Sequence, residues 1–146
     1  MGEIVNFRED APASEVPVSL EAFLGASNAT AVRIEPGEDA RALLPQLDRI
    51  ALIEVSFPAF GDGRGYSSAR ILREAGYTGE LRASGDVLVD QVPAMRRVGF
   101  DTLAPNAPID RAVMDRMLTL YDDVYQKTVD GRVPVWAKRH PEAAHG

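Results

Sequence analysis

The sequence predicts one α/β domain with about four parallel βα units, forming either an open sheet or an arrangement like half of a (β/α)8 barrel. From residue 31 onward, short runs of β-branched and apolar residues alternate with segments of helical periodicity. This alternation is typical of parallel strands joined by right-handed crossovers. The run IALIEVSF, residues 50–57, is mostly apolar and resembles strands that are covered on both faces. The length of 146 residues suits one domain.

The chain divides into three parts. Residues 1–30 mix prolines, acids and short apolar patches, which indicates an irregular lead-in with a short strand at VPVSL and a helical turn at EAFL. Residues 31–128 form the expected α/β core, and residues 129–146 form an extended tail without periodicity. The expected strands are residues 31–36, 50–57, 80–84 and 101–105, and the expected helices are residues 39–49, 67–76, 90–99 and 110–127.

Several residues mark where the helices begin or bend. Ser67 or Ser68 is the expected N-cap of the second helix, which places Arg64 just before the helix and Arg70 in its first turn. In the third helix, Asp90 is the expected cap and Pro93 lies in the first turn. Pro45 limits or distorts the first helix.

Two of the helices end in the same way. Gly76 and Gly99 are the expected stops, and the aromatic residue that follows each, Tyr77 or Phe100, is expected to pack back on its helix. Four apolar residues of the longest helix form one stripe at near-helical spacing: Val113, Met117, Tyr121 and Val124.

Composition excludes several kinds of chemistry. The sequence contains no cysteine, and its two histidines, His140 and His145, lie within the last seven residues. Disulfides, a thiolate nucleophile and a cysteine-ligated metal are excluded, and we expect no metal site. A Ser-His-Asp triad cannot be built from the body of the chain.

Charge and hydropathy indicate where the protein works. No segment approaches the run of about 18 apolar residues that a membrane span needs, and the N-terminus does not resemble a secretory signal. We therefore expect a cytoplasmic protein that does not contact membranes. The formal net charge of −6 argues against nucleic-acid binding. The tail could pack on its own domain or on a second subunit, so a homo-oligomer is possible.

The charge is distributed unevenly. Residues 1–48 contain three basic and nine acidic residues, whereas residues 64–97 contain six arginines and four acidic residues. An acidic protein with an arginine-rich middle can attract a small anion there. The alternative is that these arginines lie on solvated faces.

The segment GDGRGYSSAR, residues 61–70, joins a predicted strand to a predicted helix. Ligands of parallel sheets bind at the carboxyl ends of the strands, and helix N-termini favour anions. The segment therefore predicts a site for a small oxyanion such as phosphate, sulfate or sulfite. The candidate anion-binding residues are Gly63, Arg64, Gly65, Ser67, Arg70 and Arg82.

The same segment is compatible with roles that involve no anion. The arginines could form internal ion pairs with Asp62, Asp86 or Asp90. Asp62 or Asp86 could instead act as a catalytic acid or base, although turn-forming and capping aspartates are commoner. The glycines match neither a dinucleotide-binding nor a P-loop pattern, and could serve only a sharp turn.

Residues 57–103 resemble an uncharacterised bacterial family. The resemblance rests on FPAFGDGRGYSSARILREAGYTGELRASGDVLVDQVPAMRRVGFDTL and extends over about residues 30–128, including the pair Tyr125-Gln126. The family is sometimes labelled as an oxidoreductase probably involved in sulfite reduction, because its genes lie beside those of assimilatory sulfite reductase. Its pattern singles out Asp62, Gly63, Arg64, Ser67, Arg70, Arg73, Arg82, Gly85, Asp86 and Asp90. Of these, Arg73, Gly85 and Asp90 are expected in supporting positions.

The resemblance implies a role in sulfate assimilation. Our first hypothesis is an accessory protein that binds a small oxyanion or a phosphorylated or sulfated metabolite at residues 62–67, with sulfite reductase as a partner. The second is an enzyme acting on a sulfur metabolite, and the third is an interaction module for sulfite reductase without a ligand of its own. The sequence leaves open whether the protein is an enzyme. It indicates no cofactor, although a flavin bound without a signature stays possible.

Overall fold

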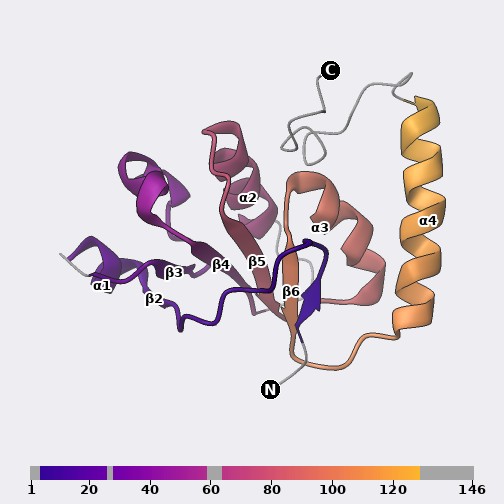
Figure 1. Cartoon of the computed structure of the whole chain (residues 1–146), viewed down its shortest axis with the longest axis horizontal. Helices are drawn as coiled ribbons and strands as arrows, with labels where there is room; N and C mark the ends of the chain where they lie inside the picture. The colour runs from indigo at the N-terminus through magenta and orange to yellow at the C-terminus, as the bar shows by residue number, and fades with distance from the viewer. Residues whose placement is uncertain (1–3, 26–27, 59–63, 129–146) are drawn as a thin grey trace.

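The computed structural model of the chain is an open α/β sheet of six strands in the order β1-β6-β5-β4-β3-β2 (Figure 1). It describes residues 4–25, 28–58 and 64–128, with residues 121–128 as backbone only. The strands are β1 (Val5–Asn6), β2 (Val18–Ser19), β3 (Ala31–Ile34), β4 (Leu52–Phe57), β5 (Glu80–Gly85) and β6 (Thr102–Pro105). Strands β2 to β6 are parallel and β1 is antiparallel to β6, which confirms the predicted α/β class with an open sheet.

The helices are α1 (Leu20–Leu24), α2 (Arg64–Glu74), α3 (Val92–Val98) and α4 (Arg111–Thr128), with 3-10 segments η1 (Ala40–Arg49) and η2 (Val89–Gln91). Strands β2 to β6 lie side by side in chain order, so right-handed crossovers place the connecting helices over one face. That face supplies the apolar core: Ile53, Val55 and Phe57 of β4 pack with helix residues such as Leu72 and Met95. Alternation turns the other residues of each strand to a helix-free face.

The lead-in crosses this helix-free face. Residues 7–17 run from β1 at one edge of the sheet, past β6 and β5, to β2 at the other edge (Figure 1). The backbone N–H of Ala13 donates to Oε1 of Glu80 (2.7 Å), and Nη2 of Arg82 donates to the carbonyl of Ala13 (2.9 Å). Strand β2 and helix α1 confirm the strand and helical turn predicted at VPVSL and EAFL, whereas β1 was not predicted.

Helix α2 begins earlier than the sequence predicts. It starts at Arg64, so Ser67 and Ser68 lie inside the helix and the predicted N-cap is wrong. Arg70 is accordingly not in the first turn. The added turn is stabilised by packing, because the ring of Tyr66 meets that of Phe57 edge-on at 5.6 Å.

The C-terminal ends of α2 and α3 follow the prediction. Gly76 and Gly99 adopt positive φ angles of 100° and 114°. The N–H groups of the next residues, Tyr77 and Phe100, return to carbonyls of the preceding turn, at 3.0 Å in each case. Both aromatic rings are buried, which confirms that they pack back on the fold.

The N-terminal end of α3 differs from the prediction. The 3-10 segment η2 precedes it, and the residue that caps α3 is Gln91, so the predicted cap at Asp90 is wrong. Pro93 does lie in the first turn. The first predicted helix is the 3-10 segment η1, which contains Pro45 and a non-helical Gln46, as expected for a proline that interrupts helical hydrogen bonding.

Helix α4 buries a stripe shifted by one residue from the predicted one. Met114 and Leu118 are 2% and 9% exposed, whereas Val113 and Met117 are only half-buried. The side chains of Tyr121 and Val124 lie outside the described residues. The contacts of α4 with α3 and η2 decide which stripe faces inward, and helical spacing alone does not.

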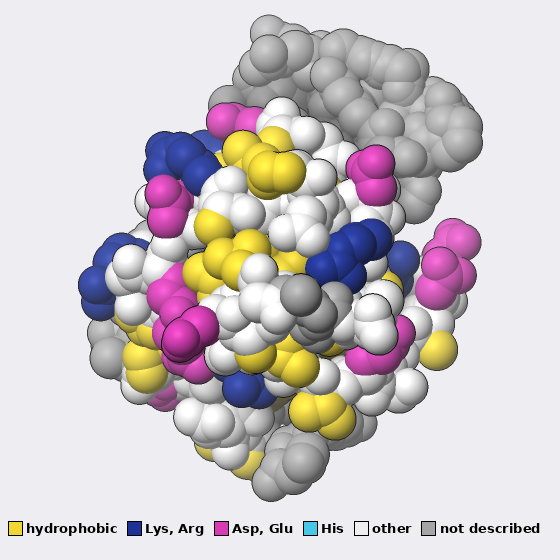
Figure 2. All heavy atoms as spheres, turned by 90° about the vertical axis from the view of Figure 1, so that its left-hand side faces the viewer, with side chains coloured by type: hydrophobic (Ala, Val, Ile, Leu, Met, Phe, Trp, Pro, Cys, Tyr) yellow, Lys and Arg dark blue, Asp and Glu magenta, His cyan; other side chains and the backbone are white. Residues whose placement is uncertain are grey.

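The acidic excess of residues 1–48 does not form a single acidic surface at the β2 edge. Figure 2 views the molecule from that edge and shows acidic, basic and hydrophobic side chains interspersed. Among the described residues, no helix combines the length and the apolar character needed to cross a membrane.

Candidate functional site

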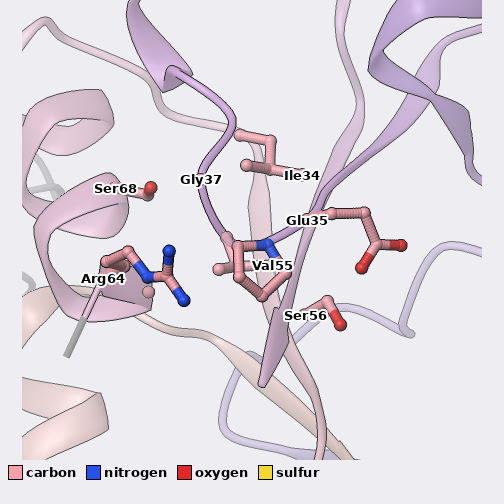
Figure 3. A pocket seen from close by; sticks show the side chains of 9 residues that line it. Ile34, Glu35, Gly37, Val55, Ser56, Arg64 and Ser68 are labelled. Atoms are coloured by element: carbon pink, nitrogen blue, oxygen red, sulfur yellow. The ribbon is translucent and has the colours of Figure 1, made fainter. Parts of the chain in front are cut away.

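A small pocket opens where β3 and β4 end and α2 begins (Figure 3). Its lining residues come from the end of β3 and the following turn, from the end of β4, and from the first turns of α2: Ile34, Glu35, Pro36, Gly37, Val55, Ser56, Arg64, Gly65 and Ser68. Its space is about 190 Å³, which includes the open mouth. That is well below the roughly 300–1,000 Å³ of drug-sized ligand sites.

Two polar side chains of α2 face this pocket. Arg64 and Ser68 are four residues apart and therefore lie on the same side of the helix. Figure 3 shows the guanidinium of Arg64 and the hydroxyl of Ser68 on the side that faces the turn with Gly37. Arg64 is exposed and Ser68 is 9% exposed, so the pocket has a cation at its mouth and a hydroxyl deeper inside.

The turn after β3 leaves room for the arginine. Gly37 has a φ of +89°, and the N–H of Glu38 donates to the carbonyl of Glu35 (3.0 Å) to close the turn. A Cβ at Gly37 would lie 3.7 Å from Nη1 of Arg64. The carboxylate of Glu35 points away from Arg64 in Figure 3.

Gly65 brings the N-terminus of α2 close to the sheet. A Cβ at this position would lie 2.3 Å from Cζ of Phe57, which is closer than atoms can approach. Gly85, at the end of β5, packs against the end of β4. Its φ is +105°, and a Cβ there would lie 2.5 Å from the carbonyl oxygen of Phe57. Both glycines are thus required by packing around Phe57, a residue to which sequence analysis assigned no role.

The electrostatics of this corner favour negative charge. The N-terminus of a helix presents backbone N–H groups and the positive end of the helix dipole. Arg64 adds a full positive charge at the same end. Nearby, burial raises the pKa of Tyr66, and the Asp90 carboxylate raises it further, so this phenol stays neutral at physiological pH.

The structure separates the residues that the sequence placed at one site. Arg64 and Gly65 line the pocket, whereas Ser67 and Arg70 are exposed on α2 and do not. Asp62 and Gly63 lie outside the described residues. Asp86 is half-buried at the end of β5, where its N–H donates to the carbonyl of Phe57 (2.7 Å), and neither Asp86 nor Asp90 lines the pocket.

The two buried arginines lie elsewhere. Arg82 is on the helix-free face, where it donates to Glu80 and to the carbonyl of Ala13. Arg73 is near the amino ends of β5 and β6, where Nη2 donates to Asp101 (2.6 Å) and to the carbonyl of Gly99 (2.8 Å). Burial also raises the pKa of Tyr77 in this region, an effect that Arg73 opposes.

Ser68 and Gly37 are among the pocket residues that were not predicted from the sequence. Ser68 could have been found from its spacing of four residues from Arg64 on a helix that starts earlier. Gly37 could have been found from the Pro-Gly pair that follows a strand on the ligand-binding edge. Among the described residues, no group of three or more His, Asp or Glu side chains could hold a metal ion.

Comparison with known proteins gives one family. Residues 31–136 match the model described as "Bacterial protein of unknown function (DUF934)". The match includes all the described residues of the pocket. No curated protein matches the chain.

Proposed function

We propose that this chain, which belongs to the family of bacterial proteins of unknown function (DUF934), binds a small oxyanion in the pocket between β3, β4 and α2. One observation carries the proposal: Arg64, the first turn of α2 and the hydroxyl of Ser68 converge on one hollow. Guanidinium, backbone N–H and hydroxyl groups are the donors that recognise sulfate, sulfite and phosphate in proteins.

The size of the hollow supports a small ion over a larger ligand. The space lined by described residues is only about 190 Å³, including its open side, which suits a small ion. A nucleotide or a flavin would have to extend through that open side. The pocket therefore fits an inorganic anion, or the anionic group of a larger metabolite.

The resemblance to proteins encoded beside sulfite reductase suggests which anion to test first. We propose sulfite or sulfate as the ligand and an accessory role in assimilatory sulfite reduction in the cytoplasm, with sulfite reductase as the partner. The absence of cysteine and of histidine in the body of the chain supports an accessory role over a self-sufficient redox enzyme.

Calorimetry at low salt tests the proposal directly. The native protein is titrated with sulfite, sulfate, phosphate and adenosine phosphosulfate, and we expect at least one of them to bind. Arg64→Ala should weaken that binding about 10- to 100-fold, because a charged hydrogen bond contributes about 1.5–3 kcal/mol. Ser68→Ala should weaken it about fivefold, as a neutral hydrogen bond would.

Helix α2 supplies matched controls for both substitutions. Arg70→Ala removes the same charge from an exposed position outside the pocket, and Ser67→Ala removes an exposed hydroxyl beside Ser68. Neither control should change the affinity by more than about twofold. If no anion binds, or if Arg64→Ala and Arg70→Ala have equal effects, the pocket is not the site. Co-purification of sulfite reductase by native protein, with and without sulfite, tests the proposed partner.

A further inference from the structure

A row of polar residues crosses the helix-free face of the sheet. Arg33 on β3 pairs in register with Glu54 on β4, which pairs with Arg82 on β5, which pairs with Thr102 on β6. All four alternate with residues of the apolar core on the opposite face. The row is separate from the pocket at α2, since none of its members lines that pocket.

The two central side chains of this row turn away from each other. Nε of Arg33 donates to Oε2 of Glu54 at 2.9 Å, which draws the carboxylate toward β3. Nη2 of Arg82 donates to Oε2 of Glu80 (2.8 Å), and its Nε donates to Oγ1 of Thr102 (3.3 Å), which draws the guanidinium toward β6. Glu54 and Arg82 are neighbours of opposite charge on adjacent strands, yet they form no ion pair.

Each of these two side chains retains one polar atom without a partner. Within the part of the chain that the structure describes, no hydrogen bond or ion pair reaches Oε1 of Glu54 or Nη1 of Arg82. The two side chains are only 9% and 7% exposed. Buried charged groups normally satisfy all their polar atoms, so we expect these two atoms to meet a partner from outside the chain.

The next row toward the carboxyl ends adds two hydroxyl groups. Ser56 and Ser84 pair in register, lie on the same face as Glu54 and Arg82, and are half-buried. The side-chain hydroxyls of both serines form no hydrogen bond with any described residue. Neighbouring strands are about 4.8 Å apart and every second residue about 6.7 Å apart, so the four side chains start from a compact rectangle.

We propose that this rectangle, formed by Glu54, Arg82, Ser56 and Ser84, is a second binding site beside the pocket at α2, with which it shares Ser56. It takes a small zwitterion with the chemistry of a free amino acid. The ligand carboxylate would accept from Nη1 of Arg82 and from the Ser84 hydroxyl, and its ammonium group would donate to Oε1 of Glu54. The two half-buried serines form the carboxyl-terminal side of the site.

The charge of the cluster selects a zwitterion over a simple ion. Arg33 and Arg82 balance Glu54 and Glu80, so the cluster is neutral. An anion would give Nη1 of Arg82 a partner but leave Oε1 of Glu54 without one beside a like charge, and a cation would do the reverse. A ligand with both charges satisfies both atoms and adds no net charge.

Calorimetry with four probes tests this second site. Glycine and L-serine carry both charges, whereas acetate and methylammonium carry one each. We expect at least one zwitterion to bind with a Kd of about 1 mM or tighter, and each half-probe to bind at least about tenfold more weakly. Glu54→Gln, which keeps the shape and removes the charge, should weaken zwitterion binding about tenfold or more.

Controls separate this site from the pocket and from an effect on folding. Glu35→Gln removes an exposed carboxylate from the neighbouring strand end and should leave zwitterion binding unchanged, as should Arg64→Ala. If Glu54→Gln fails to fold by circular dichroism, Ser84→Val replaces it, since valine suits a strand and fills the site with methyl groups. No zwitterion binding, or equal binding by the native protein and Ser84→Val, would mean that water alone occupies the rectangle and would overturn the proposal.

Discussion

Asp101 is a buried carboxylate that joins three distant segments of the chain. Its Oδ2 accepts hydrogen bonds from Nη2 of Arg73 (2.6 Å), from the backbone N–H of Leu81 (3.1 Å) and from Nη1 of Arg8 (3.2 Å). The side chains of Arg73 and Asp101 are 5% and 3% exposed. A buried charge with this many partners fixes the positions of the segments that carry them. Arg73 therefore has a structural role here, far from the pocket.

Asp101→Asn should be strongly destabilising. The substitution removes the negative charge and leaves the guanidinium of Arg73 buried without its counterion, so we expect the free energy of unfolding to fall by about 3–5 kcal/mol. Urea denaturation followed by circular dichroism measures the change. Asp39→Asn is the matched control: Asp39 also bridges an arginine, but its side chain is 62% exposed, and the expected loss is below about 1 kcal/mol. Equal losses in the two variants would contradict the role assigned to Asp101.

At the scale of secondary structure, the four core strands could be predicted because each lies between turn residues and alternates with a segment of helical periodicity. The start of α2 could not, because Arg64 and Gly65 are poor helix-start signals and the first turn is held by the contact of Tyr66 with Phe57. Strand β1 was missed since two residues carry no periodicity. Its pairing with β6 depends on tertiary structure, which the local sequence does not reveal.

The candidate site was predictable only in part, for a similar reason. The carboxyl end of β4 and the cation Arg64 follow from chain order and residue type. The position of Arg82 relative to the site could not be predicted, because it depends on which face of the sheet the helices cover. That face is set by the order of the strands, which the sequence pattern does not encode. Ser68 was missed because the helix was expected to start too late.

Gly65→Ala tests how tightly α2 must approach β4. The added Cβ would overlap the Phe57 ring, so α2 must shift outward, and we expect a loss of about 1–3 kcal/mol in the free energy of unfolding. Because the shift moves Arg64 relative to β3, anion binding at the pocket should fall as well. Gly25→Ala is the control: its Cβ would lie 3.4 Å from the nearest atom, a carbonyl oxygen, and its φ is −89°. Denaturation midpoints that fall by the same amount in both variants would argue against the proposed contact.

At the scale of the whole molecule, the two faces of the sheet are covered by different kinds of structure. Helices cover one face, and the extended segment 7–17 covers part of the other. Glu80 and Arg82, which Ala13 contacts on the helix-free face, are only 3% and 6% exposed, so water is excluded there. Side chains of the sheet hold this segment, which does not pair with the sheet as a β-strand. Its stability therefore depends on a few hydrogen bonds.

Ala13→Pro removes the donor of one of these hydrogen bonds. Proline has no backbone N–H, so Oε1 of Glu80 would lose the donor 2.7 Å away and remain buried without a partner. We expect the free energy of unfolding to fall by about 1–3 kcal/mol, as for other unsatisfied buried acceptors. Urea denaturation gives the value, and limited proteolysis should show faster cleavage within residues 7–17.

Ala11→Pro is the control for this last substitution, since Ala11 is exposed, lies in the same segment and forms no hydrogen bond that the structure describes. It should change the free energy of unfolding by less than about 0.5 kcal/mol. A large loss in Ala13→Pro with a small one in Ala11→Pro would identify the Glu80–Arg82 pair as the anchor of the segment. Equal, small losses would mean that the segment contributes little stability and that the helix-free face is stable without it.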